Sequence, residues 1–181
     1  MKGIVFREFI DFVEDQAGED VVDNMIEKAN PASGAAYTTV GKYDWKEMVD
    51  LVVALSEITS TPVPDLLHVF GRHLFGRLQK TYPQFLWGSA NAFDFLQTVE
   101  TKIHMEVLKL YPDAELPTLD ITVRSSAELT VVYSSCHPFG DLCVGMIEGC
   151  GDHFQEEFEI ENRPKENGLD IIVRRVFQQA A

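Results

Sequence analysis

The stretch "TLDITVRSSAELTVVYSSCHPFG", residues 118–140, decides the fold, because the hydrophobic period of the chain changes here. Apolar residues occupy every second position from 119 to 123 and again from 129 to 133, with the turn-like "RSSA" between the two runs. Side chains two apart on a strand point to one face of the sheet. The pattern therefore predicts a β-hairpin. Its second strand would continue through Tyr133, Ser135 and His137 on one face before a turn at Pro138 and Gly140.

The end of this hairpin offers groups that can hold an anion. Tyr133, Ser135 and His137 would present two hydroxyls and an imidazole side by side. The whole chain is acidic, with a formal net charge of -14. This charge argues against binding to nucleic acid or to an anionic membrane surface, because both need basic patches.

The composition is that of one medium-sized domain, or of two tightly joined subdomains, with a substantial core. The chain has 181 residues, of which 45% are hydrophobic. No apolar run approaches the ~20 residues of a membrane span, and the charges in "MKGIVFREFIDF" come too early for a signal peptide. Cys136, Cys143 and Cys150 are odd in number and closely spaced, unlike a secreted disulfide framework. We therefore expect a cytoplasmic protein.

Before Pro117 the periodicity is helical. Phe6, Phe9, Ile10 and Val13 have the spacing of one helix face. Further amphipathic runs follow, one opening with a capping box at residues 44 and 47, and the last being residues 92–111, with position 91 as its cap. After the first hairpin we expect a helix at about 140–155 and a second hairpin with "RPKENG" as its turn. The prediction is an α+β protein, with a helical subdomain (about 1–111) packed on a ββαββ subdomain (about 112–181) with an antiparallel sheet.

Candidate chemical groups are few. His104 lies mid-helix at the edge of an apolar stripe, where a hydrogen-bonded boundary residue and a metal ligand are both compatible with the pattern. Cys143 and Cys150 share a helix face and fit a buried stripe. Together with His137 or His153 the cysteines form a nominal zinc set, although no C-x-x-C pair supports it. Phosphate-binding and dinucleotide-binding loops, H-E-x-x-H and nucleophile–base pairs are missing from the sequence, so we expect no catalytic site and no enzyme.

Taken in order, several segments resemble the haem-nitric oxide/oxygen binding (H-NOX) family, in particular bacterial stand-alone members related to the sensor domain of soluble guanylate cyclase. The segments are "MKGIVF", "FGRHLF", "KIHMEVLKLYPDAELP", and the Tyr-x-Ser stretch leading to "GMIEG". The resemblance covers essentially the whole chain. It implies a non-covalent haem b (iron protoporphyrin IX) between the two halves.

The resemblance also assigns roles to individual residues. His104 would be the proximal iron ligand, and Pro117 would press on the porphyrin and distort it. Tyr133 and Ser135 match the family motif that holds the haem propionates, which would be the anion sought above. His137 stands where the family has arginine, and it offers one ring N–H in place of a bidentate fork. We expect His137 to contact the propionates, the alternative being a residue that merely ends the strand at the surface.

On the distal side the resemblance predicts an apolar pocket. Position 142, where oxygen-binding members have tyrosine, is leucine. Bound dioxygen needs a hydrogen-bond donor and nitric oxide does not, so this pocket favours nitric oxide, with carbon monoxide as a further ligand. The expected pocket residues are Val5, Phe9, Leu74, Leu78, Leu142 and Met146.

The function implied is a nitric oxide sensor. Nitric oxide at ferrous haem would weaken the iron–His104 bond, so that the helix shifts and the porphyrin relaxes from Pro117. The chain ends at Ala181 without an output domain, so we expect a separate partner, either a histidine kinase or a cyclic-di-GMP enzyme. The alternatives are a haem-independent thiol or zinc redox switch using the three cysteines, and a haem-storage protein.

Overall fold

Helices make up the first 110 residues and strands dominate the remainder, which confirms the predicted α+β class. The computed structural model describes residues 1–166 and 168–177. The α-helices are α1 (Gly3–Ala17), α2 (Glu19–Ala29), α3 (Trp45–Thr59), α4 (Val63–Thr81), α5 (Ala92–Thr98), α6 (Met105–Leu110) and α7 (Gly140–Phe154). The other elements are a 3₁₀ turn η1 (Pro83–Leu86), a π-helical segment η2 (Val99–His104), and strands β1 (Thr118–Val123), β2 (Glu128–Ser134), β3 (Phe158–Lys165) and β4 (Gly168–Arg175).

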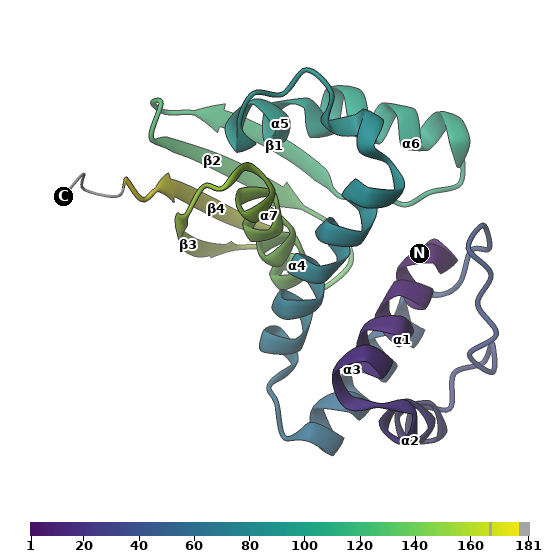
Figure 1. Cartoon of the computed structure of the whole chain (residues 1–181). Helices are drawn as coiled ribbons and strands as arrows, with labels where there is room; N and C mark the ends of the chain where they lie inside the picture. The colour runs from purple at the N-terminus through teal and green to yellow at the C-terminus, as the bar shows by residue number, and fades with distance from the viewer. Residues whose placement is uncertain (167, 178–181) are drawn as a thin grey trace.

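The four strands form one antiparallel sheet in the order β1-β2-β4-β3. The predicted alternation of the first hairpin is confirmed, since Leu129, Val131 and Tyr133 are all buried on one face. That face packs against α5, α7 and Phe75 of α4, so the sheet is covered on one side (Figure 1). Val123, at the end of β1, is exposed.

The turn predicted for the second hairpin is wrong in its extent. β3 continues to Lys165 and β4 begins at Gly168, so Arg163 and Pro164 belong to the strand. Proline has no N–H and is excluded from central strands, but β3 is the edge of the sheet and pairs only with β4. Position 167 of the predicted turn, and residues 178–181, lie outside the described residues.

The start of α3 carries a side-chain cap, as the sequence predicted in part. Asp44 accepts a hydrogen bond from the backbone N of Lys46 at 3.0 Å. The predicted reciprocal bond of a capping box does not form, because the Glu47 carboxylate instead accepts hydrogen bonds from Ser33 and, at 2.8 Å, from the Tyr37 hydroxyl. These bonds hold the loop before α3 against that helix.

The helix predicted over residues 92–111 is interrupted. Its cap is confirmed, since Asn91 accepts from the Asp94 backbone N at 3.0 Å. Between α5 and α6, however, η2 winds as a π-helix that ends at His104. A π-helical turn holds one residue more than an α-helical ring, so the side chains beyond it point in a new direction, and such turns are frequent at functional sites.

The long helix α4 joins the two subdomains by crossing α7 (Figure 1). Glycines make this crossing close. A Cβ at Gly145 would lie 1.9 Å from the carbonyl oxygen of His68, and one at Gly71 would lie 2.2 Å from that of Leu142. At these two glycines the helices therefore meet backbone to backbone.

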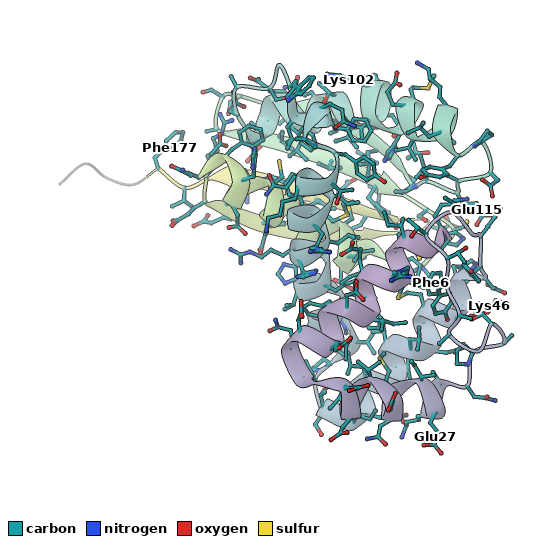
Figure 2. The ribbon with its side chains drawn as sticks, turned by 45° about the vertical axis from the view of Figure 1, so that its right-hand side comes forward. Phe6, Glu27, Lys46, Lys102, Glu115 and Phe177 are labelled. Atoms are coloured by element: carbon teal, nitrogen blue, oxygen red, sulfur yellow. The ribbon has the colours of Figure 1, made fainter. Side chains whose placement is uncertain are left out.

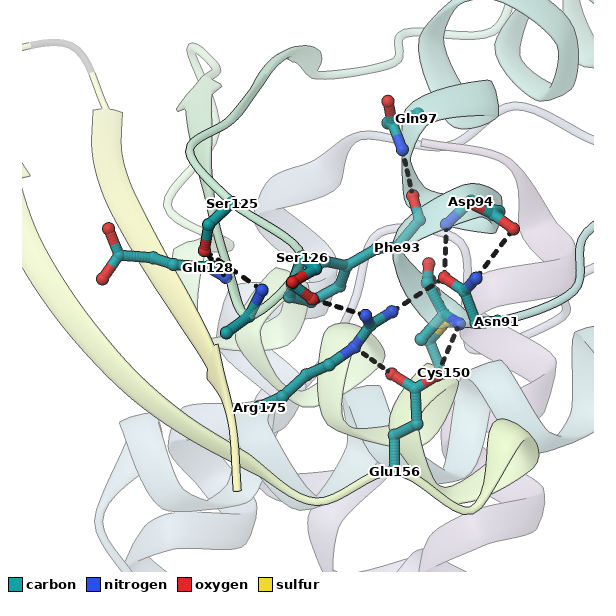
Figure 3. A network of polar contacts seen from close by, with 12 residues as sticks. Asn91, Phe93, Asp94, Gln97, Ser125, Ser126, Glu128, Cys150, Glu156 and Arg175 are labelled. Atoms are coloured by element: carbon teal, nitrogen blue, oxygen red, sulfur yellow. Dashed lines mark hydrogen bonds and ion pairs between the residues drawn. The ribbon is translucent and has the colours of Figure 1, made fainter. Parts of the chain in front are cut away.

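A polar network around Arg175 ties the far end of the second subdomain together (Figure 3). The guanidinium donates to Glu156 and to Asn91, both at 2.8 Å, and to the backbone oxygen of Ser126 at 2.6 Å. It also lies over the ring of Phe93, 3.9 Å from the centroid. The start of α5, which leads into the His104 segment η2, is thereby fixed to β4 and to the loop after α7. None of the helices in the described part of the chain is long and apolar enough to span a membrane.

Candidate functional site

His104 is held by one ring nitrogen only. Its Nδ1 lies 3.0 Å from Oε2 of Glu100, one turn earlier, and its side chain is 14% exposed. The same Glu100 oxygen accepts a hydrogen bond from the backbone N of Leu119 at 3.1 Å. Within residues 1–166 and 168–177, His104 Nε2 makes no hydrogen bond.

This arrangement selects the state of the imidazole. An ionised carboxylate can only accept hydrogen bonds, so the proton of a neutral His104 lies on Nδ1. The lone pair then lies on Nε2, which is the nitrogen left for a metal. The donor set therefore fits an iron ligand, and the boundary role considered for His104 does not by itself account for the unpaired nitrogen.

The structure corrects the geometry predicted for the anion-holding groups. β2 ends at Ser134, so Ser135 and His137 do not continue its alternation. The chain turns here, and the backbone N of His137 donates to Ser135 Oγ at 3.0 Å. Burial raises the pKa of the Tyr133 phenol, while a hydrogen bond with the Ser135 side chain partly opposes the rise. Tyr133 and Ser135 are thus neighbours, brought together by a local turn instead of by the pleat.

His137 points away from the sheet toward the helical subdomain. Its ring lies 4.9 Å from the ring of Trp45 at the start of α3, and its Nε2 lies 3.8 Å from Oε2 of Glu115. The His137 side chain is only 12% exposed, whereas a residue that merely ends a strand at the surface would be largely exposed. Glu115 also pairs with Lys42 at 2.7 Å and with the N-terminal amine of Met1 at 3.8 Å. Figure 2 shows Glu115 where the loop before β1 meets the start of α1.

Pro117 is half-buried and directly precedes β1. Because Leu119 is bonded to Glu100, the residues just after Pro117 are connected to the His104 segment through one carboxylate oxygen. Pro117, in the loop before β1, and His104, at the end of η2, are therefore linked through Glu100 and the backbone of Leu119.

The six residues predicted for the distal pocket belong to one apolar cluster. Phe9, Leu74 and Leu142 are buried, and Val5, Leu78 and Met146 are half-buried against them. They come from α1, α4 and α7, three helices that meet where the subdomains join. Phe9 packs edge to face on Phe70 at 5.0 Å. None of the six side chains carries a hydrogen-bond donor.

The three cysteines are free thiols in the described chain and are not part of a cluster of metal-ligating side chains. No group of three metal-ligating side chains occurs in the described residues. Cys136 is exposed, whereas Cys150 is buried in the core of the sheet subdomain and Cys143 is half-buried against it, as the stripe pattern predicted. Burial raises the pKa of the Cys143 thiol to about 12 and that of Cys150 further still, which disfavours the reactive thiolate.

Sequence reasoning missed three residues of this site. Glu100 could have been found from its spacing, because side chains four apart on a helix face one another. Trp45 and Glu115 gave no comparable signal, since their contacts with His137 join residues far apart in the sequence.

The fold and the site define a class of protein, a two-part α+β domain with two features. One is a histidine with a ring nitrogen free to bind a metal, and the other is an apolar cluster where the two parts join. A family model described as "Haem-NO-binding" matches residues 2–162. A search of curated protein sequences yields no significant match.

Comparison with solved structures points to the same family as the family model. Fe(II) unliganded H-NOX protein from K. algicida has a TM-score of 0.93 and 33% identity, with 100% of both chains covered. An IWP-051-bound H-NOX from Shewanella woodyi in the Fe(II)CO state has a TM-score of 0.84 and 34% identity, covering 100% of this chain and 97% of that one. An H-NOX protein from S. oneidensis in the Fe(II)NO state shares the fold, with a TM-score of 0.90 and 24% identity over 98% of this chain and 100% of that one. The chain belongs to the haem-NO-binding (H-NOX) family, whose domains bind haem and act as gas sensors.

Proposed function

We propose that this chain is a nitric oxide sensor that carries haem b and signals to a separate protein by a change of shape. The observation that carries the proposal is the combination of a free Nε2 on His104 with a six-residue apolar cluster free of donors. Bound ferrous haem would supply an iron that binds diatomic gases. His104 would hold this iron through Nε2, with its ring oriented by Glu100.

The propionates would be held at the turn after β2. Tyr133 and Ser135 offer two hydroxyls, and His137 offers its ring N–H. His137 already faces the Glu115 carboxylate, which supports its ability to hold an anion and also makes Glu115 a competitor for it. Pro117 would act on the porphyrin from the start of β1, as in the family pattern.

Ligand choice would follow from the apolar cluster. Stable binding of dioxygen requires a donor near its partial negative charge, and Leu142 provides none. Nitric oxide and carbon monoxide do not need such a donor. We therefore expect nitric oxide to be the physiological ligand and carbon monoxide to bind as well.

The signal would begin with His104. Its segment η2 is π-helical, and the following helix α6 exposes Met105 and Leu110, so α6 is only loosely packed. Release of His104 from the iron would therefore leave this segment free to move against β1. The receiving protein would be a histidine kinase or a cyclic-di-GMP enzyme. The sensor itself would have no catalytic activity.

The proposal is tested by the absorption spectrum of protein purified from haem-supplied cells. We expect a Soret band that shifts with nitric oxide and carbon monoxide but forms no stable oxy complex in air. His104→Gly should lose most of its haem, and added imidazole should restore part of it. His153→Gly, which changes an exposed histidine at the end of α7, serves as the control and should keep its haem. A colourless wild-type protein, or full haem content in His104→Gly, would overturn the proposal.

A further inference from the structure

Glu100 uses one oxygen for two contacts that join different parts of the fold. Oε2 lies 3.0 Å from His104 Nδ1 and accepts from the backbone N of Leu119 at 3.1 Å. Glu100 and His104 are both in η2, whereas Leu119 is the second residue of β1. The carboxylate therefore lies between the histidine and the strand that follows Pro117.

This contact differs from an ordinary pair on a helix surface. Exposed pairs four residues apart contribute only a few tenths of a kcal/mol, roughly 0.2–0.5. Here the histidine side chain is 14% exposed, and the Glu100 side chain, although 41% exposed, is held by a second bond from another element. β1 is an edge strand, so a backbone N–H directed away from β2 would lack a strand partner. Glu100 satisfies the N–H of Leu119 and is itself held in place by it.

The contact with Glu100 affects how His104 could bind a metal. A carboxylate that accepts from Nδ1–H fixes the ring's orientation, keeps the lone pair on Nε2 and increases the electron density available to a metal. Among the described residues, Glu100 is the side chain that accepts from His104 Nδ1. The neighbouring carboxylate, Glu106, is instead paired with Lys109 at 2.6 Å.

We propose that Glu100 is a positioning residue: it sets the strength of the iron–His104 bond and ties His104 to β1, the element against which the His104 segment moves. This inference rests on the proposed function, since it requires His104 to be the iron ligand. Glu100 would touch neither gas nor iron, so its effect on the iron would pass through the histidine.

The experiment compares Glu100→Gln and Glu100→Ala with Glu106→Gln, a control that removes the same charge from the next turn without touching His104. In the haem-free protein, the hydrogen-exchange rate of the Leu119 amide reports the tie to β1. We expect this amide to remain protected in Glu100→Gln, whose side-chain oxygen still accepts, and to lose protection in Glu100→Ala.

In the haem-loaded proteins, the iron–histidine stretching frequency measured by resonance Raman reports the bond. It should fall in Glu100→Gln, because a neutral amide is a weaker acceptor, and fall further in Glu100→Ala. Loss of such a metal-ligand partner typically costs about 10–100-fold in metal affinity, so haem should dissociate faster from Glu100→Ala by a factor of that order. Glu106→Gln should match the wild type in every measurement.

The results separate this inference from the proposed function. If His104→Gly loses haem but both Glu100 variants keep the wild-type stretching frequency, exchange rate and haem affinity, the role of Glu100 is overturned and the sensor proposal stands. If His104→Gly retains haem, the proposed function falls and this inference falls with it. A lowered frequency in the Glu100 variants, with Glu106→Gln unchanged, supports the role of Glu100.

Discussion

Replacing Gly145 by alanine tests whether the α4–α7 crossing depends on direct backbone contact. The new Cβ would lie 1.9 Å from the His68 carbonyl oxygen and 3.0 Å from the Arg72 backbone N, whereas ordinary contact begins at 3.4 Å. The crossing would have to open locally by about 1.5 Å. Since the obstructing atoms are backbone, no side-chain rotation can relieve the clash.

The magnitude follows from two opposed effects. Overpacking typically costs about 1–3 kcal/mol and sometimes more, and a backbone clash belongs at the upper end or beyond. Alanine regains roughly 0.8–1.0 kcal/mol of helix propensity. The net loss is therefore about 2 kcal/mol, which for a protein of this size lowers Tm by about 4–8 °C. Gly76 on α4 is the matched control, because its Cβ would meet nothing within 4 Å. Gly76→Ala should raise Tm by about 2–4 °C.

Thermal unfolding of the haem-free proteins, followed by circular dichroism, measures both effects without a contribution from haem binding. A Tm for Gly145→Ala at or above that of the wild type would refute the reasoning, as would equal shifts in the two variants. Because Leu142 and Met146 flank Gly145 on α7, the haem-loaded Gly145→Ala protein should also release carbon monoxide faster than the wild type.

Three further predictions concern the site. Leu142→Tyr should gain measurable dioxygen affinity in air, seen by absorption, whereas Leu142→Phe should not; equal behaviour would show that the hydroxyl is not what matters. His137→Arg should slow haem transfer to an acceptor protein and His137→Ala should speed it, and identical rates in all three proteins would mean that His137 does not hold the propionates. A thiol reagent at neutral pH should modify Cys136 promptly and leave Cys143 and Cys150 intact by mass spectrometry, because burial raises the pKa of both buried thiols. Comparable labelling of Cys150 in the folded protein would contradict this assignment.

Periodicity was sufficient for the elements and for the faces that they bury. The change from a helical period to a period of two located the switch from helices to the sheet, and the faces that it predicted for Phe6, Phe9 and Val131 are buried. Only the structure shows that these residues lie in two separate clusters. These features are local, because the partition of side chains between core and solvent repeats with the geometry of each element. The candidate site residues were proposed from the resemblance of short segments to the H-NOX family, because the pattern around His104 by itself left a boundary residue and a metal ligand both open.

The tertiary structure alone decided how the site is oriented. The π-helical segment before His104, the turn that takes Ser135 off the strand, and the contact of His137 with Trp45 left no periodic signal in the sequence. The contact of His137 with Trp45 depends on atoms that lie close only after the subdomains pack. The π-helical segment and the turn at Ser135 are local, but hydrophobic periodicity does not show where a helix changes its winding or where a strand ends. The carboxylate of Glu100 illustrates the division. Its spacing from His104 is written in the sequence, but its bond to the backbone of β1 exists only because the strand is an edge whose N–H needed a partner.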